Sequence, residues 1–184
     1  FPIVLEAVRE FYAAGHPTRI RLLSEVLGGV WDALVTQRAD IALAEVGTPG
    51  ALGISHRPLG TVAFVFAVAP DHPLARETQP IKLTAIRRHR VVAVADSSRS
   101  APARSSGVTG AVDVLTVASL QAKLSAQLCG LGVGFLPANL AAEAIAQGQL
   151  VALRVAAPKP RVALSVAWRA QGAGPATLWF VERL

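Results

Sequence analysis

The sequence is poor in residues that build covalent or metal-held scaffolds. It has a single cysteine, Cys129, which excludes an intrachain disulfide and is typical of a reducing compartment. We expect the Cys129 thiol to be buried in a structural role. The four histidines are far apart in the sequence: His16, His56, His72 and His89. Their spacing matches no metal-ligand motif, so we expect no metal site.

Long apolar runs and catalytic motifs are also absent. No apolar run reaches the roughly 18 residues that a membrane helix needs, and the longest, residues 62–69, has the length of a buried strand. The first residues lack a basic region, and Glu6 interrupts their apolar run, so they are not a secretory signal. The sequence contains no GxSxG nucleophile elbow, and Cys129 has no nearby histidine. We expect a cytoplasmic protein with no membrane partner, no cofactor, no catalytic residue and no enzyme activity.

The residues that are present describe a folded, basic protein. The chain is 52% hydrophobic with a mean hydropathy of +0.45, and its 184 residues suffice for one substantial domain or two small lobes. Its net charge of +6 is compatible with nucleic acid or anionic ligands. The arginines are scattered, however, and the one tight cluster, Arg87, Arg88 and Arg90, fits a solvated face before a strand.

Strand-like and helix-like segments alternate along the chain, which predicts an α/β protein with mainly parallel strands. We expect strands at residues 19–23, 40–44, 54–59, 62–69, 91–95, 114–117, 133–136, 150–155 and 162–168. We expect helices at residues 3–11, 27–35, 83–87, 120–128, 137–147 and 176–184. Proline-bearing linkers near residues 70–80 and 156–160 divide the chain into three segments. We therefore predict lobe I from residues 1–70 plus 161–184 and lobe II from residues 71–160, with a hinge and a cleft between them.

Residues 115–137 (LTVASLQAKLSAQLCGLGVGFLP) predict one βαβ unit. Ser119 is a suitable N-cap, and Gly130 and Gly132 suit the helix C-terminus. The predicted apolar face of the helix carries Leu120, Leu124 and Leu128, with Gln121, Lys123, Ser125 and Gln127 between them. The glycines do not form a dinucleotide fingerprint, because that fingerprint needs a strand before them and a helix after them.

Four segments in order resemble the effector-binding domain of LysR-type transcriptional regulators. They are residues 1–22 (FPIVLEAVREFYAAGHPTRIRL), 34–46 (LVTQRADIALAEV), 59–75 (LGTVAFVFAVAPDHPLA) and 115–137. The resemblance implies two Rossmann-like lobes joined by two crossover strands, a fold like that of type 2 periplasmic binding proteins. Measured against the family, the first strand and the N-terminal winged helix-turn-helix head are missing, so we expect this chain to be a fragment. Any DNA binding is implied only through that missing head.

Ligand contacts in such a fold are expected at the carboxyl ends of strands and at helix N-termini. The residues at these positions are Ser24, Glu25, Glu45, Ser97, Ser98, Arg99, Ser100, Arg104, Phe135 and Pro137. Serine hydroxyls and helix amides bind oxyanions or polar ring edges, an arginine clamps a carboxylate, and Phe135 offers an apolar wall. Glu45 offers an acceptor to an amine or a purine-like ring if it faces the cleft. The alternative is that the serines and arginines are ordinary loop residues and that Glu45 faces solvent.

The expected function is that of the ligand-sensing and oligomerisation domain of a LysR-type regulator. The resemblance implies that a small effector binds between the lobes and alters how the absent heads engage DNA. It also implies a homodimer, and a tetramer in the full-length protein. The alternative is a two-lobed solute-binding protein for transport. The sequence upstream of Phe1 separates the two, because a helix-turn-helix indicates regulation and a secretory signal indicates transport.

Overall fold

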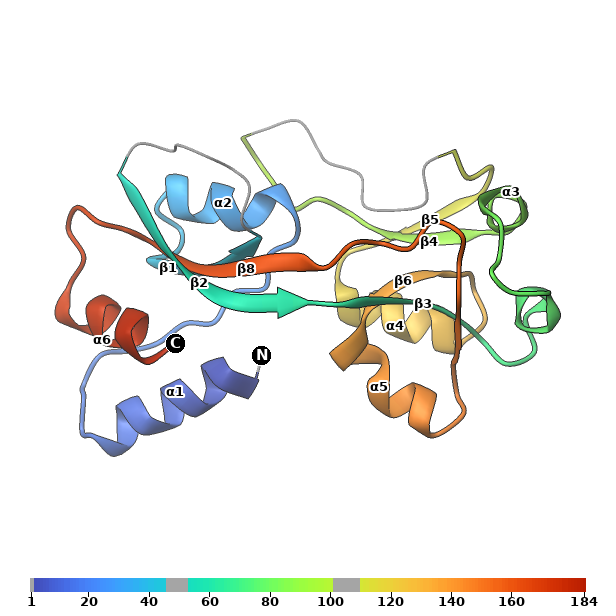
Figure 1. The fold of residues 1–184 in the computed structure, drawn as a ribbon. Helices are drawn as coiled ribbons and strands as arrows, with labels where there is room; N and C mark the ends of the chain where they lie inside the picture. The colour runs from blue at the N-terminus through green and yellow to red at the C-terminus, as the bar shows by residue number, and fades with distance from the viewer. Residues whose placement is uncertain (1, 46–52, 101–109) are drawn as a thin grey trace.

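A computed structural model of the chain describes residues 2–45, 53–100 and 110–184 (Figure 1). Its helices are α1 (Pro2–Ala13), α2 (Gly28–Val35), α3 (Leu83–Ile86), α4 (Leu120–Leu128), α5 (Ala138–Ala146) and α6 (Pro175–Arg183), with a 3-10 helix at Pro73–Arg76. Its strands are β1 (Ile41–Glu45), β2 (Ile54–Val62), β3 (Phe64–Val68), β4 (Val91–Val94), β5 (Val114–Val117), β6 (Gly134–Pro137), β7 (Val151–Leu153) and β8 (Val162–Arg169). No helix of the described ranges is both long and apolar enough to span a bilayer.

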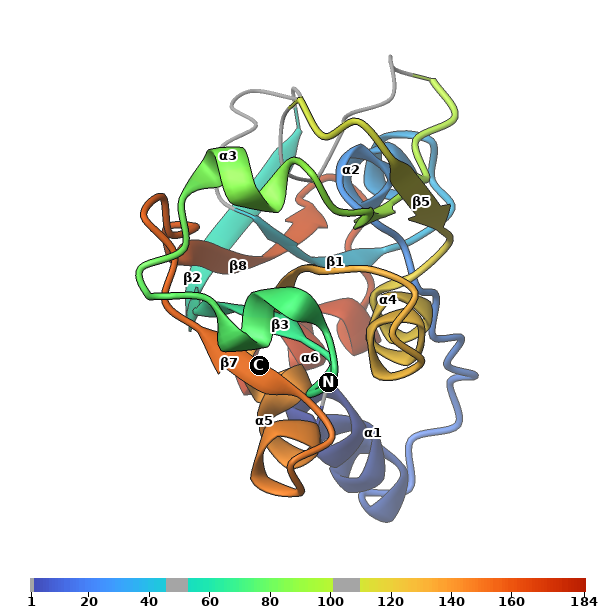
Figure 2. The same cartoon turned by 90° about the vertical axis from the view of Figure 1, so that its right-hand side faces the viewer.

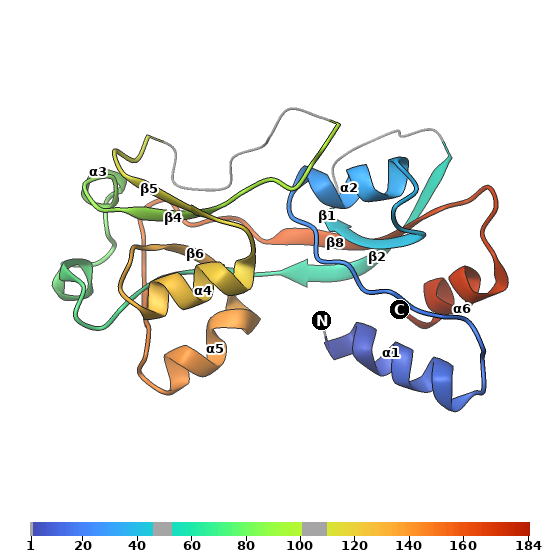
Figure 3. The ribbon, with the colours of Figure 1, turned by 180° about the vertical axis from the view of Figure 1, so that it is seen from behind.

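The strands form two groups at opposite ends of an elongated molecule (Figures 1 and 3). One group is the sheet β1-β8-β2, with α1, α2 and α6 around it. The other contains the sheet β6-β3-β7 and the pair β4-β5, with α3, α4 and α5. The described residues thus form an α/β body with two lobes. We call the first group lobe I and the second lobe II.

The prediction of mainly parallel strands is wrong for the described residues. Among their strand pairs only β4 and β5 run parallel, and β8 lies antiparallel between β1 and β2. Strand β3 is also antiparallel to both of its neighbours, β6 and β7. The hydrophobic pattern could not show this, because it reports which side chains are buried and not the direction of the neighbouring strand.

The chain crosses from lobe I to lobe II earlier than the predicted boundary at residue 70. Strand β2 pairs with β8 of lobe I, whereas β3 pairs with β6 and β7 of lobe II. Only Ala63 lies between β2 and β3. The sequence gives no sign of this crossing, because the apolar run of residues 62–69 continues through Ala63 without a break. The chain returns to lobe I between β7, which pairs with β3, and β8, which pairs with β2.

The strand predicted at residues 19–23 does not form, and a cavity lies beside that segment. The cavity measures about 480 Å³ and is lined on one side by residues 18–25 and on the other by residues 39–43. Side chains of α1 and α6 also line it. Among the described strands, β1 has a partner on one side only, which is β8. The alternating pattern was misleading, because a strand needs a neighbouring backbone at hydrogen-bonding distance.

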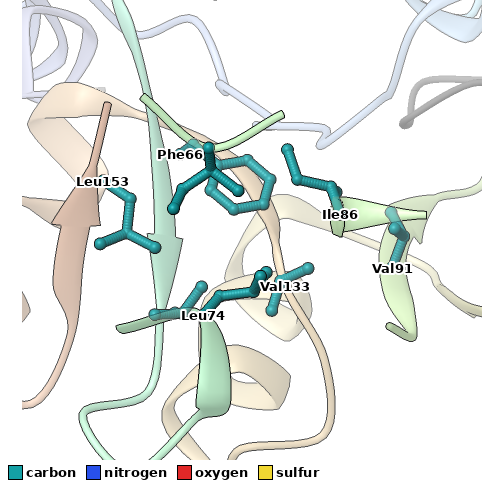
Figure 4. Close-up of a cluster of buried hydrophobic side chains, with 8 residues drawn as sticks. Phe66, Leu74, Ile86, Val91, Val133 and Leu153 are labelled. Atoms are coloured by element: carbon teal, nitrogen blue, oxygen red, sulfur yellow. The ribbon is translucent and has the colours of Figure 1, made fainter. Parts of the chain in front are cut away.

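The cores of the two lobes are separate. In lobe II, Phe66, Leu74, Ile86 and Val133 pack with Val68, Ile81, Val91 and Leu153 (Figure 4). In lobe I, Phe11 packs with Ala7 and Phe180 between α1 and α6. Figure 2 shows α4 and α5 on the side of β3 and β6 that faces away from α3. Leu124 and Leu136 form part of a second lobe II cluster on that side.

The predicted βαβ unit is confirmed, with β4 between its strands. β5 pairs with β4 in parallel, and a parallel bridge joins Val91 of β4 to Val133 beside β6. Ser119 caps α4, since its Oγ accepts a hydrogen bond from Ala122 N at 3.1 Å. Gly130 ends the helix at a φ of +69° with two C-terminal hydrogen bonds. Gly132 has a different role from the predicted one, because a Cβ there would lie 2.7 Å from the carbonyl oxygen of Arg90.

Two further expectations are wrong, the leucine face of α4 and the burial of Cys129. The buried residues of α4 are Lys123, Leu124, Ala126 and Gln127, whereas Leu120 is exposed. The helix is therefore turned so that two polar side chains face the sheet. Cys129 is exposed. His72 and His89, which are distant in the sequence, have ring centroids 4.7 Å apart.

Candidate functional site

The loop after β4 in lobe II reaches the N-terminus of α2 in lobe I (Figure 1). Ser97 Oγ accepts a hydrogen bond from Val26 N at 2.7 Å and donates one to Glu25 Oε2 at 2.5 Å. Asp96 Oδ1 accepts a hydrogen bond from Gly29 N at 3.1 Å. Leu27, just before α2, has a φ of +53°, which is rare for a residue with a side chain. These contacts hold the two lobes together at one point.

Asp32 of α2 extends this contact to the next residues of the loop. Its side chain is 2% exposed, and Oδ2 accepts hydrogen bonds from Arg38 Nη2 at 2.8 Å and from Arg99 N at 3.3 Å. The Ser100 hydroxyl donates to the other carboxylate oxygen. Arg38 also pairs with Glu25, so it links both carboxylates. We call the whole set the interlobe junction: Glu25, Val26, Gly29, Asp32, Arg38, Asp96, Ser97, Ser98, Arg99 and Ser100.

Two carboxylates of the junction, Asp32 and Glu25, are stabilised in their charged form. The hydrogen bond from Ser100, followed by that from Arg38, holds the pKa of Asp32 below its ordinary value. Burial acts to raise the pKa of Glu25, but the hydrogen bonds from Ser97 and Arg38 outweigh it, so this pKa is also lowered. At neutral pH the junction therefore offers charged acceptors, serine hydroxyls and one exposed arginine side chain, Arg99.

The structure brings five of the predicted site residues into the junction. They are Glu25, Ser97, Ser98, Arg99 and Ser100. Ser24 is exposed and lines the cavity of lobe I with Glu25, next to the junction. Arg104 lies outside the described residues. Several of these groups bond to each other across the lobes, so a ligand at this place has to compete with contacts within the chain.

The remaining predicted residues lie elsewhere. Pro137 is the partner of Phe64 in the β3–β6 register, at the crossing between the lobes. The Lys159 Nζ lies 3.9 Å from the centroid of the Phe64 ring. Glu45 is exposed, and its charge acts on Lys159. These four residues form a second group, which we call the crossover group.

Phe135 lies in neither group. Its ring is 5.3 Å from that of Phe66, edge to face, and it packs against the lobe II core while remaining partly exposed. The sequence reasoning missed Asp32, Arg38, Asp96 and Lys159. Asp96 directly follows the strand predicted at residues 91–95, and that position is a signal which the sequence offered. Arg38 and Lys159 carry no comparable signal, because basic residues in turns and linkers are common.

Comparison with known proteins identifies the family. The family described as LysR substrate binding domain matches residues 2–184. The chain is 34% identical to "Uncharacterized HTH-type transcriptional regulator YeeY" of Escherichia coli over 187 residues, covering 100% of this chain and 60% of that protein. A second regulator, YhaJ of the same species, is 33% identical over 175 residues and is covered to 58%, with 94% of this chain aligned. The chain thus spans about three fifths of these curated relatives.

A solved structure shows the same fold. The regulatory domain of CcmR from Synechocystis, in complex with 2-PG, has a TM-score of 0.72 at 18% identity and covers 97% of this chain and 88% of its own. The predicted two-lobed α/β fold, similar to that of type 2 periplasmic binding proteins, is confirmed. The chain belongs to the LysR substrate binding domain family, the effector-binding part of LysR-type transcriptional regulators.

Proposed function

We propose that this chain senses a small effector at the interlobe junction and passes the signal to a DNA-binding head in the longer protein. The observation that carries this proposal is the pair of hydrogen bonds that Ser97 and Asp96 accept from the Val26 and Gly29 amides at the start of α2 in the other lobe. A ligand that binds these groups more tightly in one lobe arrangement than in another shifts the balance between them. The relatives named as HTH-type transcriptional regulators favour regulation over transport.

The junction suits a small ligand that has both hydrogen-bond donors and acceptors. The amides of Val26 and Gly29 at the start of α2 and the side chain of Arg99 attract negatively charged groups. Glu25 and Asp32 accept hydrogen bonds from hydroxyls or amines. The matched CcmR domain was solved with 2-PG, so this fold accommodates a small molecule.

The test combines ligand binding with DNA binding. A thermal-shift screen of small metabolites on this chain identifies the effector, because a ligand that binds only the folded state raises its melting temperature. The same ligand is then added to the longer protein in an operator-binding assay, where we expect a change in affinity or in the footprint. Turnover of the ligand, or an unchanged operator complex in every ligand state, would contradict the proposal.

Two variants test the junction directly. We expect Ser98→Ala and Arg99→Ala to weaken the ligand-induced shift while the melting temperature without ligand changes little, because Arg99 is exposed. Arg88→Ala, in the same lobe and also exposed, is the matched control and should leave the ligand shift unchanged. If both junction variants respond to ligand like the unmodified protein, the effector binds elsewhere.

The remaining parts of the proposal concern the longer protein. We propose that it works in the cytoplasm as a homodimer or tetramer, that it has no enzyme activity, and that this chain contributes to assembly. Sedimentation of this chain and of the longer protein tests the assembly. If this chain is a monomer at every concentration, it does not contribute to assembly. Ligand sensing would then be tested separately.

A further inference from the structure

Two polar side chains are buried side by side between α4 and the sheet of lobe II. Lys123 is 4% exposed and Gln127 is fully buried. They lie one helical turn apart, so both side chains emerge from the same face of α4. A lysine so deeply buried is rare unless its ammonium group has a partner.

The polar ends of these side chains converge above Gly134 of β6. A point at the position of a Cβ on Gly134 lies 3.2 Å from Lys123 Nζ, 3.2 Å from Gln127 Nε2 and 3.2 Å from the carbonyl oxygen of Val92. A larger residue at position 134 would press on all three groups. Glycine at this position therefore lets the two polar side chains pack directly against β6.

Neither side chain has a partner within the described residues. Both amide atoms of Gln127, Nε2 and Oε1, are buried without a hydrogen bond there. None of the ion pairs formed by the described residues includes Lys123. Buried polar groups are nearly always hydrogen-bonded, so this arrangement is complete only when a further group enters it.

The charge around Lys123 is positive. Burial lowers the pKa of Lys123 to about 8, and the Lys159 ammonium acts in the same direction. Lys159 belongs to the crossover group and is influenced by Glu45, whereas no carboxylate acts on Lys123 in this way. An anion is the group that this environment lacks.

The site is close to the boundary between the lobes. β6 runs from Gly134 to Pro137, which pairs with Phe64 beneath Lys159. Figure 3 shows the start of α4 turned toward lobe I. A ligand in the interlobe region meets Lys123 if it extends along the length of β6, from Pro137 to Gly134.

We propose that Lys123 and Gln127 bind a single carboxylate group of the effector, which enters between their polar ends beside Gly134. Lys123 Nζ and Gln127 Nε2 donate to the carboxylate oxygens, and Gln127 Oε1 accepts from a neighbouring hydroxyl or amine of the ligand. One lysine and one amide match one monoanion. That the ligand is an effector rests on the proposed function. The carboxylate site itself can be tested without that function.

The direct test follows the Lys123 signal by NMR in protein carrying ¹³C-labelled lysine, with acetate as the probe. The Lys123 resonance is assigned by its loss in Lys123→Met. We expect acetate to shift it in a saturable way, and binding to weaken by about tenfold or more in Gln127→Leu and above the pKa of Lys123. Acetamide, which is neutral and of similar shape, should have no effect. The signal of the exposed Lys82 should not respond.

The outcomes separate this site from the junction. An unchanged Lys123 signal, or an equal response to acetamide, would overturn the carboxylate site even if an effector still binds at the junction. A saturable acetate response in a protein whose DNA binding ignores every ligand would support the site and contradict the proposed function. Lys123→Met should raise the melting temperature without ligand, because it removes an unpaired buried charge. A large decrease would show that Lys123 is already compensated and would contradict the proposal.

Discussion

At the scale of single residues, Ser97 links the lobes with one hydroxyl. Its Oγ accepts from the Val26 amide and donates to Glu25, so it is used in both directions. Asp96 beside it holds the Gly29 amide. Hydrogen bonds between distant parts of a chain contribute to stability only while those parts stay together, so these residues report on the contact of the lobes.

Ser97→Ala should therefore destabilise the fold by about 1–2 kcal/mol, since it leaves the Val26 amide and the Glu25 carboxylate without this partner. Urea unfolding measures the change. Ser125→Ala is the control, because Ser125 is an exposed residue on α4 and its loss should cost well under 1 kcal/mol. Equal effects of the two substitutions would show that the Ser97 hydrogen bonds do not stabilise the protein.

The stability of the fold should also depend on pH through His72, whose neutral form is favoured in the folded state. Burial, and next the charge of His89, lower the pKa of His72, while Asp71 acts weakly against them. Because the unfolded chain then binds a proton more readily than the folded one, stability should fall as the pH drops from about 7 toward 5. Glu25 and Asp32 do not interfere in this window, since their lowered pKa values make their contribution fall only below about pH 4.5.

Thermal unfolding at a series of pH values tests this prediction. His72→Asn keeps a side-chain acceptor for the Leu74 amide, which His72 Nδ1 serves in this structure, but it cannot take up a proton. We expect its melting temperature to depend less on pH between 5 and 7 than that of the unmodified protein. The same pH slope in both proteins would assign the dependence to other groups.

At the scale of elements, the turn from α4 to β6 uses its glycines for two different reasons. Gly130 needs a positive φ of +69°, but the space around it is open, with Ala69 Cβ at 3.9 Å the nearest atom. Gly132 has an ordinary φ but would place a Cβ 2.7 Å from the Arg90 carbonyl oxygen and 3.0 Å from a Val92 methyl group. The backbones of β4 and of the turn can approach this closely only without a side chain.

Gly130→Ala should cost about 1 kcal/mol, and Gly148→Ala about the same, because Gly148 has a φ of +71° with nothing near it. Gly132→Ala should cost more, about 2–3 kcal/mol, because backbone atoms have to move. Urea unfolding of the three variants measures these changes in the free energy of unfolding. A Gly132→Ala cost equal to or below that of Gly130→Ala would exclude the close approach of β4.

At the scale of the whole molecule, two chain crossings and the interlobe junction connect the lobes. The crossings lie at β2–β3 and before β8, and each lobe has its own hydrophobic cluster. The lobes can therefore change their relative placement without breaking either core. The polar junction is the part that has to rearrange, which suits a domain that responds to a ligand.

The double variant Asp96→Asn with Ser97→Ala should loosen the lobes without unfolding them. We expect faster hydrogen exchange at the Val26 and Gly29 amides, whose acceptors are in the other lobe, and a larger radius of gyration in X-ray scattering. Amides in the β2–β8 ladder serve as the internal control and should keep their protection. Loss of protection in that ladder would indicate global unfolding instead of lobe movement.

The sequence by itself determined the local elements and the family. Capping at Ser119, the glycine at the end of α4 and the order of the motifs depend on neighbours in the chain, so they could be predicted. It also placed the loop of residues 97–100 among the candidate site residues, because that loop follows a buried strand.

The tertiary structure decided the rest. Strand direction, the crossing at Ala63 and the meeting of Asp32 with Ser100 depend on contacts between residues far apart in the chain, which no local pattern records. The same holds for α4, where spacing predicted a leucine face and packing instead turned Lys123 and Gln127 toward the sheet. The orientation of a short helix depends on what its partner surface accommodates, and here Gly134 leaves the space that admits two polar side chains.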